Sequence, residues 1–229
     1  MNNPFSKVTV IIPTLNEDKN IGKLLDIILS KYKGIHVIVA DDGSCDRTAL
    51  ITKSYSMRNP NVILLDRRNE KIKGLCASVI DAAKKTETEF MIVIDGDLQH
   101  PPERIGEMAF LLETYDIVEG RRKKVISDWP AHRKIISKTA TLLAKLRVGN
   151  KSKDPLSGFF GVKTKKFKET LKRSEHKFEK KGYKVYFDLL KYVKKPKIGL
   201  IDYEFGMRGG GESKIRTRHI LIFLRSLFK

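Results

Sequence analysis

The stretch FMIVIDGDLQ, residues 90–99, decides the fold class, because an entirely apolar run ends directly in two carboxylates separated by one glycine. An apolar run without polar alternation is typical of a strand that is covered on both faces of a parallel sheet. Asp95, Gly96 and Asp97 therefore lie on a tight turn at the carboxyl end of that strand. Ligands bind beyond these strand ends in open α/β sheets, so the turn is a candidate site.

Similar apolar runs alternate with helical patterns on both sides of this stretch. Strands are predicted at residues 8–12, 36–40, 62–65, 90–94, 117–118, 158–162 and 198–205. Helices are predicted from about residue 21 to Gly34, from Ser44 or Asp46 to Pro60, over 72–84, from Pro101 onward, and over 135–146, 183–192 and 219–228. Asn16 or Asp18 can cap the first helix. This order predicts an α/β, Rossmann-like, mainly parallel sheet with helices on both faces.

The acidic residues at two strand ends are the first chemical signal. Asp41 and Asp42 follow the second predicted strand, as Asp95 and Asp97 follow the fourth. The carboxyl ends of parallel strands meet at one edge of a sheet, so both clusters are expected on one rim. Paired carboxylates suit a hard divalent ion, and carboxylates at a strand end also suit ribose hydroxyls. Solvated turns and helix caps remain the alternative interpretation for both clusters.

Charge divides the chain in two. The net charge is +19; residues 1–120 hold 15 Lys+Arg and 18 Asp+Glu, a net of −3, and residues 121–229 hold 31 and 9, a net of +22. This asymmetry suggests an anionic partner for the second half, either nucleic acid or an anionic membrane surface. A solvated lysine-rich surface is the plainer alternative.

Length and cysteine content exclude several classes. The 229 residues, 41% of them hydrophobic, fit a single domain, 1–229. The two cysteines lie in no metal-binding or redox spacing and are expected to be reduced thiols in a cytosolic protein. No apolar run approaches the roughly 20 residues of a spanning helix, and the N-terminus lacks a signal-peptide pattern. The chain as given is expected neither to span a membrane nor to be exported.

Six segments resemble one known family. VTVIIPTLNE, VADDGSCDRT, VIDGDLQHPPE, WPAHRKIIS, DPLSGFFG and FGMRGGGESK occur in the order found in dolichyl-phosphate mannose synthases and related polyprenyl-phosphate glycosyltransferases. The resemblance runs from Val8 to Lys214, and the last three segments are the more specific ones. It implies an inverting nucleotide-sugar transferase with the GT-A fold.

The resemblance also implies a donor site and a metal site. The residues that it places at the nucleotide sugar are Pro13, Asn16, Glu17, Asp41, Asp42, Asp95, Asp154 and Lys214. Those that it places at the metal, expected to be Mg²⁺ or Mn²⁺, are Asp95, Asp97 and Gln99. Without the resemblance, Asp154 is equally well explained as a helix cap or a turn residue before proline.

The acceptor site is implied in the basic half. Arg122, Arg133 and Ser137 match positions that face the acceptor phosphate, and guanidinium groups suit phosphate oxygens. Arg133 and Ser137 are four residues apart and share one helix face. Arg208 and Lys214 flank a triple glycine that departs from the family pattern, and they match residues near the diphosphate or acceptor on a closing loop. The residues implied in catalysis are Asp97, Arg122, Arg133 and Arg208. A basic surface without phosphate contact is the alternative.

These assignments divide the expected catalytic domain into three parts. Residues 1–120 are the nucleotide-sugar half, residues 121–212 the basic acceptor side, and residues 213–229 an amphipathic helix suited to a membrane interface. A core-packed helix is the alternative, and it is the commoner structure for such a pattern. A phosphate monoester is already anionic at neutral pH, so its attack needs no strong general base.

The expected reaction is transfer of mannose from GDP-mannose to a polyprenyl or dolichyl phosphate, with UDP-glucose as the alternative donor. A saccharide hydroxyl acceptor ranks lower, because the QxxRW motif of processive relatives is missing. A nucleic-acid-binding protein is suggested only by charge, and no RNP, zinc-finger or basic-zipper pattern supports it. An inactive scaffold is disfavoured by the intact DGDLQ segment.

The expected partners are therefore the donor, the lipid phosphate, an anionic membrane surface and a membrane protein, with no nucleic acid. The expected location is peripheral, on the cytoplasmic face of a membrane.

Overall fold

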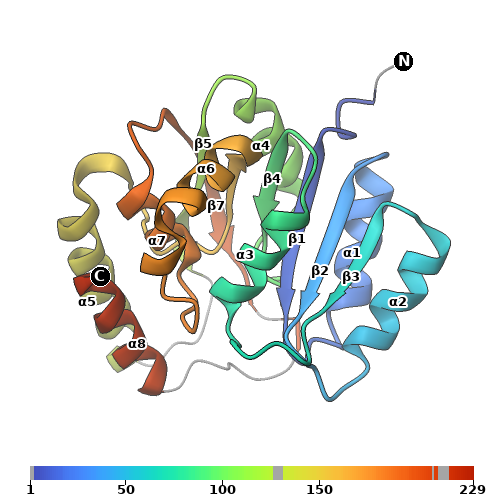
Figure 1. Ribbon diagram of the computed structural model, residues 1–229, viewed down its shortest axis with the longest axis horizontal. Helices are drawn as coiled ribbons and strands as arrows, with labels where there is room; N and C mark the ends of the chain where they lie inside the picture. The colour runs from blue at the N-terminus through green and yellow to red at the C-terminus, as the bar shows by residue number, and fades with distance from the viewer. Residues whose placement is uncertain (1–2, 126–130, 208, 211–216) are drawn as a thin grey trace.

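The computed structural model describes residues 3–125, 131–207, 209–210 and 217–229, and for residues 125, 131–136 and 217–219 it describes the backbone alone. These residues form one sheet with helices packed on both of its faces (Figure 1). The predicted architecture is confirmed.

The sheet has seven strands in the order β3-β2-β1-β4-β6-β5-β7. They are β1 (Val8–Thr14), β2 (His36–Asp41), β3 (Val62–Asp66), β4 (Phe90–Val93), β5 (Ile117–Val125), β6 (Phe160–Lys163) and β7 (Ile198–Phe205). β6 runs antiparallel to both of its neighbours, and the other pairings are parallel. The sheet is therefore mainly parallel, as the apolar runs predicted.

Helices cover the two faces unequally. The described α-helices are α1 (Ile21–Lys31), α2 (Thr48–Arg58), α3 (Leu75–Lys85), α4 (Ile105–Leu112), α5 (Ala131–Val148), α6 (Thr164–Ser174), α7 (Val185–Tyr192) and α8 (Thr217–Phe228). Short 3₁₀ turns occupy Pro102–Arg104, Gly149–Lys151 and Glu175–Lys177. Buried residues of α3, α5, α6, α7 and α8 form the core on one face, and those of α1 and α4 form the core on the other.

Several elements differ from the prediction, among them β5, α6 and α3; α5 also begins earlier, at Ala131 rather than residue 135. β5 extends to Val125 rather than stopping after two residues, because it pairs with β7 along its whole length, with a bulge between Arg122 and Lys124. α6 was not predicted, although its buried residues Phe167, Thr170 and Leu171 recur at helical spacing among lysines. α3 begins at Leu75, three residues later than expected.

The helix caps also correct the prediction. α1 begins after Asn20, which makes no side-chain cap bond, so neither Asn16 nor Asp18 caps it. The N-cap of α2 is Arg47, so neither Ser44 nor Asp46 occupies that position, although the Asp46 carboxylate accepts the Thr48 N–H at 2.9 Å. Burial works against ionisation of Asp46, but the hydrogen bonds from Thr48 and Asp18 outweigh it and lower the pKa of the carboxyl.

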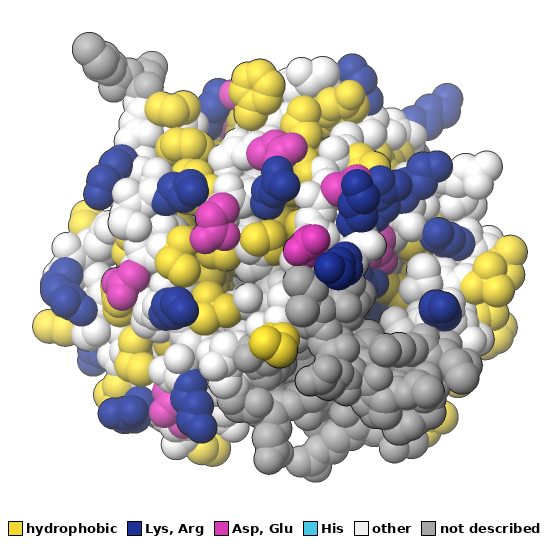
Figure 2. All heavy atoms as spheres, turned by 180° about the vertical axis from the view of Figure 1, so that it is seen from behind, with side chains coloured by type: hydrophobic (Ala, Val, Ile, Leu, Met, Phe, Trp, Pro, Cys, Tyr) yellow, Lys and Arg dark blue, Asp and Glu magenta, His cyan; other side chains and the backbone are white. Residues whose placement is uncertain are grey.

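Basic side chains are spread over the surface instead of forming one dense patch on the face seen in Figure 2, where Lys and Arg alternate with Asp, Glu and apolar groups. On that face, the dispersal fits a solvated lysine-rich surface.

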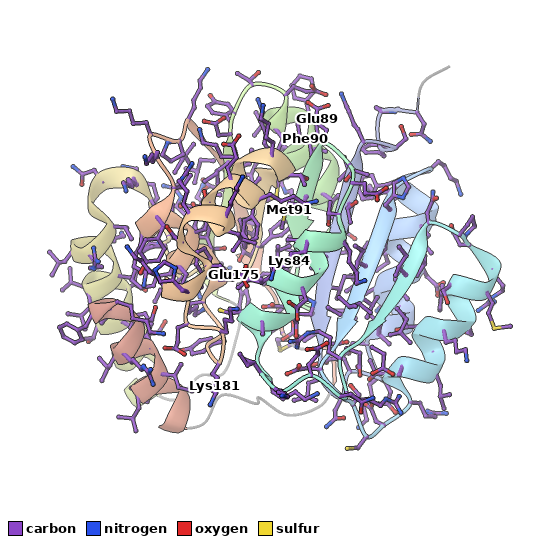
Figure 3. The ribbon with its side chains drawn as sticks, viewed as in Figure 1. Lys84, Glu89, Phe90, Met91, Glu175 and Lys181 are labelled. Atoms are coloured by element: carbon purple, nitrogen blue, oxygen red, sulfur yellow. The ribbon has the colours of Figure 1, made fainter. Side chains whose placement is uncertain are left out.

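Strand β4 connects the two cores. Phe90 and Ile92 lie in the core beneath α1 and α4, and Met91 and Val93 lie in the core beneath α3 and α7. Phe90 and Met91 can be followed on adjacent positions of the strand in Figure 3. A strand that is buried on both faces holds its end rigidly, and the acidic turn follows directly.

The terminal helix α8 is partly built into the core. Phe223 and Leu227 are buried, and Ser226 bonds to the Asp188 carboxylate at 2.8 Å. Along the described chain, no helix combines the length and the apolar character needed to cross a bilayer.

Candidate active site

The acidic clusters meet where the strand order reverses. β1 pairs with β2 on one side and with β4 on the other, so successive connections leave β1 in opposite directions. This is the switch point at which open α/β sheets bind ligands. Thr14, Asp41 and the turn after Val93 all lie at this rim, and the sequence predicted this for the two acidic clusters.

The turn at residues 95–98 is tightly packed. A side chain at Gly96 would come within 3.2 Å of Thr14 Cγ2 and 3.5 Å of Glu17 Cγ, so Thr14 would have to shift by a few tenths of an ångström to admit it. The buried Asp97 carboxylate accepts the Gln99 N–H at 3.1 Å, and its carbonyl accepts the Gly209 N–H at 3.1 Å. Asp95 is the more exposed of the two acids.

His100 packs against the buried side of this turn. The ring is 1% exposed and is surrounded by Phe159, Tyr203 and Phe205. Burial lowers the pKa of His100 to about 4, so the ring is neutral at pH 7. Its Nδ1 accepts the Asp95 N–H at 3.3 Å. This residue was not predicted from the sequence, although it directly follows the quoted DGDLQ segment.

The described residues fit a divalent ion that is completed by substrate. No group of three or more His, Cys, Asp or Glu side chains gathers as a ready-made metal site among them. Asp95 and Asp97 offer two carboxylates, and magnesium sites commonly combine one or two carboxylates with substrate phosphates. At Gly158, a side chain would approach Asp95 Oδ2 at 2.9 Å, so glycine there leaves room for the carboxylate. The Gln99 amide nitrogen donates to the Gly206 carbonyl at 3.0 Å, which ties the turn to the end of β7.

The loops after β1 and β2 bind each other. Asn16, with a φ of 52°, accepts the Cys45 N–H at 2.8 Å and donates its own N–H to Ser44 Oγ at 2.8 Å. The Asp41 carboxylate accepts the Ser44 N–H at 2.8 Å, the Thr14 hydroxyl at 3.2 Å and the Ser44 hydroxyl. Two predicted donor residues, Asn16 and Asp41, therefore shape this rim through bonds within the chain.

Asp42 turns toward the protein interior. Its carboxylate receives the Arg67 guanidinium and the Gly74 N–H, the latter at 2.7 Å. Burial raises the pKa of Asp42 despite these two favourable contacts. Arg67 is almost fully buried and also bonds Asp81 at 3.0 Å. Arg67 was not predicted from the sequence, because its partners lie as many as 25 residues away.

Arg122 and Asp154 form one ion pair. Arg122 Nε and one terminal nitrogen each donate to an Asp154 oxygen at 2.7 Å. Burial opposes the charge on both groups, but the pairing outweighs it and raises the pKa of Arg122 while lowering that of Asp154. The buried Glu119, which was also not predicted, holds this segment by accepting the Asp154 N–H at 2.7 Å and the Tyr186 hydroxyl at 2.8 Å.

Lys184 lies beside the ion pair. Its ammonium donates to the Leu156 carbonyl at 2.7 Å. Burial is the main cause that lowers the pKa of Lys184 to about 8, and repulsion from Arg122 adds to it. Attraction to Asp95 and Asp154 acts in the opposite direction. Nothing in its local sequence distinguishes this lysine from its basic neighbours, so it was not among the predicted site residues.

The remaining predicted residues are placed only in part. Pro13 lies within β1, the buried Glu17 follows it, and Ser137 lies in α5. The backbone of Arg133 belongs to α5, but its side chain lies outside the described residues, as do Arg208 and Lys214 altogether. The structure thus brings Asp95, Asp97, Arg122 and Asp154 to one rim and leaves the other basic residues as predictions.

Comparisons with known proteins agree with this arrangement. A family model described as Glycosyl transferase family 2 matches residues 9–171. A dolichol-phosphate mannosyltransferase from Pyrococcus furiosus is 33% identical over 97% of this chain and 63% of its own length. Another dolichol-phosphate mannosyltransferase, from Mycosarcoma maydis, is 30% identical over 96% of this chain and 77% of its own length. The chain therefore spans less than two thirds of the Pyrococcus furiosus protein.

A solved structure confirms the fold. The glucosyl-3-phosphoglycerate synthase of Mycobacterium tuberculosis, in complex with Mn²⁺, uridine diphosphate and glucosyl-3-phosphoglycerate, has a TM-score of 0.67 at 18% identity. The match covers 96% of this chain and 77% of that one. At this identity the likeness shows the fold alone, which is the predicted GT-A fold.

Proposed function

The chain belongs to glycosyl transferase family 2, and from this premise we propose that it is a metal-dependent, inverting enzyme that moves a hexose from a nucleotide sugar to a polyprenyl phosphate. Mannose from GDP-mannose is the proposed donor reaction, because both dolichol-phosphate relatives carry mannosyltransferase names. The observation that carries the proposal is the pair of carboxylates at the end of β4, beside the switch point of the sheet.

The proposed metal ligands are Asp95 and Asp97, with Gln99 beside them. When bound, a divalent ion supplies positive charge that stabilises the departing nucleoside diphosphate. The Mn²⁺ and uridine diphosphate in the Mycobacterium tuberculosis structure support this choice of ion and ligand class. The donor nucleotide is proposed to lie along Pro13, Asn16, Glu17, Asp41 and Asp42.

The acceptor phosphate is proposed to approach from the side of Arg122. Arg122 is already charged and oriented by Asp154, so it can attract an anion without reorganising. Arg133, Ser137, Arg208 and Lys214 complete this proposal from the family match. Because the phosphate oxygen is itself the nucleophile, the protein has to position the two anionic substrates and stabilise the leaving group.

The first test is transfer of label to lipid. The protein, with Mn²⁺ or Mg²⁺ and a polyprenyl phosphate, is incubated with radiolabelled GDP-mannose or UDP-glucose. Label in the organic phase from GDP-mannose supports the full proposal. Label from UDP-glucose alone would replace the donor and keep the reaction class, and no label from either donor would overturn the proposal.

The metal assignment is tested by Asp97→Ala. Loss of a metal ligand is expected to lower transfer by about 10³-fold, because stabilisation of the leaving group is lost. The matched control is Asp66→Ala, which removes an exposed carboxylate at the end of the edge strand β3, where it pairs with Arg68. Full transfer by a folded Asp97→Ala protein would refute the assignment.

A further inference from the structure

A buried carboxylate on strand β5 binds the loop between α5 and β6. Glu119 is 1% exposed. One of its oxygens accepts the Lys153 N–H at 3.0 Å and the Asp154 N–H at 2.7 Å. The other accepts the Tyr186 hydroxyl at 2.8 Å and the Ser152 hydroxyl. We call this set of four hydrogen bonds the Glu119 clamp.

The donors of the clamp are all uncharged groups. Burial of a carboxylate is unfavourable unless hydrogen bonds replace its lost water, and bonds to a charged acceptor are the stronger kind. Burial, followed by the charge of Glu119, raises the pKa of Tyr186 well above its ordinary value, so that its hydroxyl remains a donor. Ile117 and Val118, just before Glu119, are apolar and fill the two cores. A carboxylate at the next position therefore indicates a task that packing alone does not require.

The clamp holds the backbone of Asp154, and Arg122 holds the side chain of the same residue. Arg122 Nε and Nη2 each donate to an Asp154 oxygen at 2.7 Å. Glu119 and Arg122 stand three residues apart on β5, which is about 10 Å along a strand. Both positions pair with β7, at Leu200 and Tyr203. The loop is therefore tied to one strand at two points, and the Asp154 carboxylate has little freedom to turn.

Helix α7 supports this arrangement from the face of the sheet that it shares with α3 and α6 (Figure 1). Besides the bond from Tyr186 to Glu119, the Lys184 ammonium donates to the Leu156 carbonyl of the same loop at 2.7 Å. A guanidinium carries five N–H donors in a rigid fork, and Asp154 engages two of them in Arg122, which leaves others for an anion. The direction in which those donors point depends on Asp154.

We propose that Glu119 is a positioning residue, which orients Arg122 toward the acceptor phosphate by fixing the loop that carries Asp154. The inference rests on the proposed function, in which Arg122 attracts that phosphate. Glu119 itself touches neither substrate, so its loss should affect the acceptor and leave the donor and the metal alone.

The first measurement is steady-state transfer with geranyl phosphate, a water-soluble prenyl phosphate, as the acceptor. Glu119→Leu removes the clamp and should raise the KM for geranyl phosphate about tenfold, the effect of one misplaced charge-assisted hydrogen bond. The KM for the donor should not change, because Asp41, Asp95 and Asp97 follow other strands. Glu119→Gln keeps an oxygen for the two N–H groups and should restore the KM for geranyl phosphate to within about twofold.

The matched control is Glu204→Leu, which changes an exposed glutamate on the adjacent strand β7. It should keep both KM values. If Glu119→Leu raises the KM of acceptor and donor by the same factor, or of neither, the proposal is overturned, since a merely structural clamp would not distinguish the two substrates.

A shorter side chain serves if Glu119→Leu shows no cooperative thermal transition by circular dichroism. Glu119→Asp keeps the charge but withdraws the carboxylate by one methylene. It should raise the KM for geranyl phosphate about threefold or more, because the loop has to move to keep its bonds. An acceptor KM equal to that of the unchanged protein would overturn the proposal.

A double-mutant cycle tests whether Glu119 acts through Arg122. In an Arg122→Met background, Glu119→Leu should bring no further loss of affinity for geranyl phosphate, measured by calorimetry with Mn²⁺ and GDP present. A further tenfold loss in that background would show that Glu119 acts by another route, and would refute the proposal.

Calorimetry also separates this inference from the proposed reaction. If the unchanged protein transfers no sugar but binds geranyl phosphate, and the variants weaken binding in the expected order, the reaction fails and the positioning role stands. If sugar is transferred and Glu119→Leu binds geranyl phosphate as tightly as the unchanged protein, the reaction stands and the positioning role is refuted. Absence of both binding and transfer would refute both.

Discussion

His100 holds the acidic turn without contributing charge. Its folded pKa of about 4 lies below the ordinary value of about 6.5. The unfolded chain therefore binds a proton more readily between these values, and stability is lost as the pH falls from 6.5 toward 4. The difference corresponds to about 3 kcal/mol. Urea unfolding in EDTA, from pH 7.5 down to 4.5, should show this loss in the unchanged protein.

His100→Gln should flatten that dependence and lower stability at pH 7.5, because a ring is removed from an aromatic cluster. The matched variant His176→Gln changes an exposed histidine and should keep the original profile. If the stability of His100→Gln fell with pH as steeply as that of the unchanged protein, the conclusion that His100 is buried and neutral would be contradicted.

The Arg122–Asp154 pair is expected to serve both stability and function. Asp154→Asn leaves a largely buried guanidinium without its counter-charge and should cost about 3 kcal/mol in urea unfolding. The double variant Arg122→Met/Asp154→Leu should recover most of this stability, because an apolar pair can replace a buried ion pair. It should nevertheless transfer no sugar. A stable and fully active double variant would reduce the pair to a structural role.

Only part of the site could be predicted from sequence. Asp95 and Asp97 stand out because an apolar strand ends in them, a local pattern. Arg67 and Glu119 could not be found this way, because their burial is explained by partners 14 to 67 residues distant. His100 lies within the motif, yet its role depends on rings from β7 and from Phe159.

At the scale of elements, the start of α3 depends on one glycine. Gly74 has a φ of 141°, and a side chain there would come within 2.8 Å of the Lys180 carbonyl and 3.0 Å of Lys181 Cα. The first turn of α3 donates to this segment, from Ala77 N–H to the Lys180 carbonyl and from Cys76 N–H to Gly182. Gly74→Ala should cost about 3 kcal/mol in thermal or urea unfolding.

The comparison for this substitution is Gly149→Ala. Gly149 also has a positive φ, of 67°, but nothing lies within 4 Å of an added side chain. The expected cost is about 1 kcal/mol, from backbone conformation alone. Equal costs for the two variants would show that the close approach to Lys180 is not what requires glycine at position 74.

Element prediction worked where burial was uniform. The strands β1, β2 and β4 are buried along their length, so their apolar runs identify them directly. β5 and α6 were misjudged for different reasons. The second part of β5 is polar and is held in the sheet by β7. The buried residues of α6, which are Thr164, Phe167, Thr170 and Leu171, do recur at helical spacing, so this helix could have been predicted from the sequence.

At the scale of the molecule, the single domain of residues 1–229 is still a prediction, and it can be tested by truncation. A fragment of residues 1–125 would keep α3 but lose β6, which pairs with β4, and α7, which also packs in the core of Met91 and Val93. We expect the fragment to show no cooperative thermal transition by circular dichroism, in contrast to the full chain. A cooperative transition in the fragment would divide the chain into two independent units.

Strand β6 lies between β4 and β5 but follows both of them in the chain. During synthesis, Asp95 and Asp97 leave the ribosome about 60 residues before β6, the strand that must pair with β4. Pairings this distant in sequence form slowly. The rim that carries Asp41, Asp95 and Asp97 is therefore expected to assemble first in the nascent chain, and the loop that carries Asp154 is expected to join it only when β6 pairs with β4.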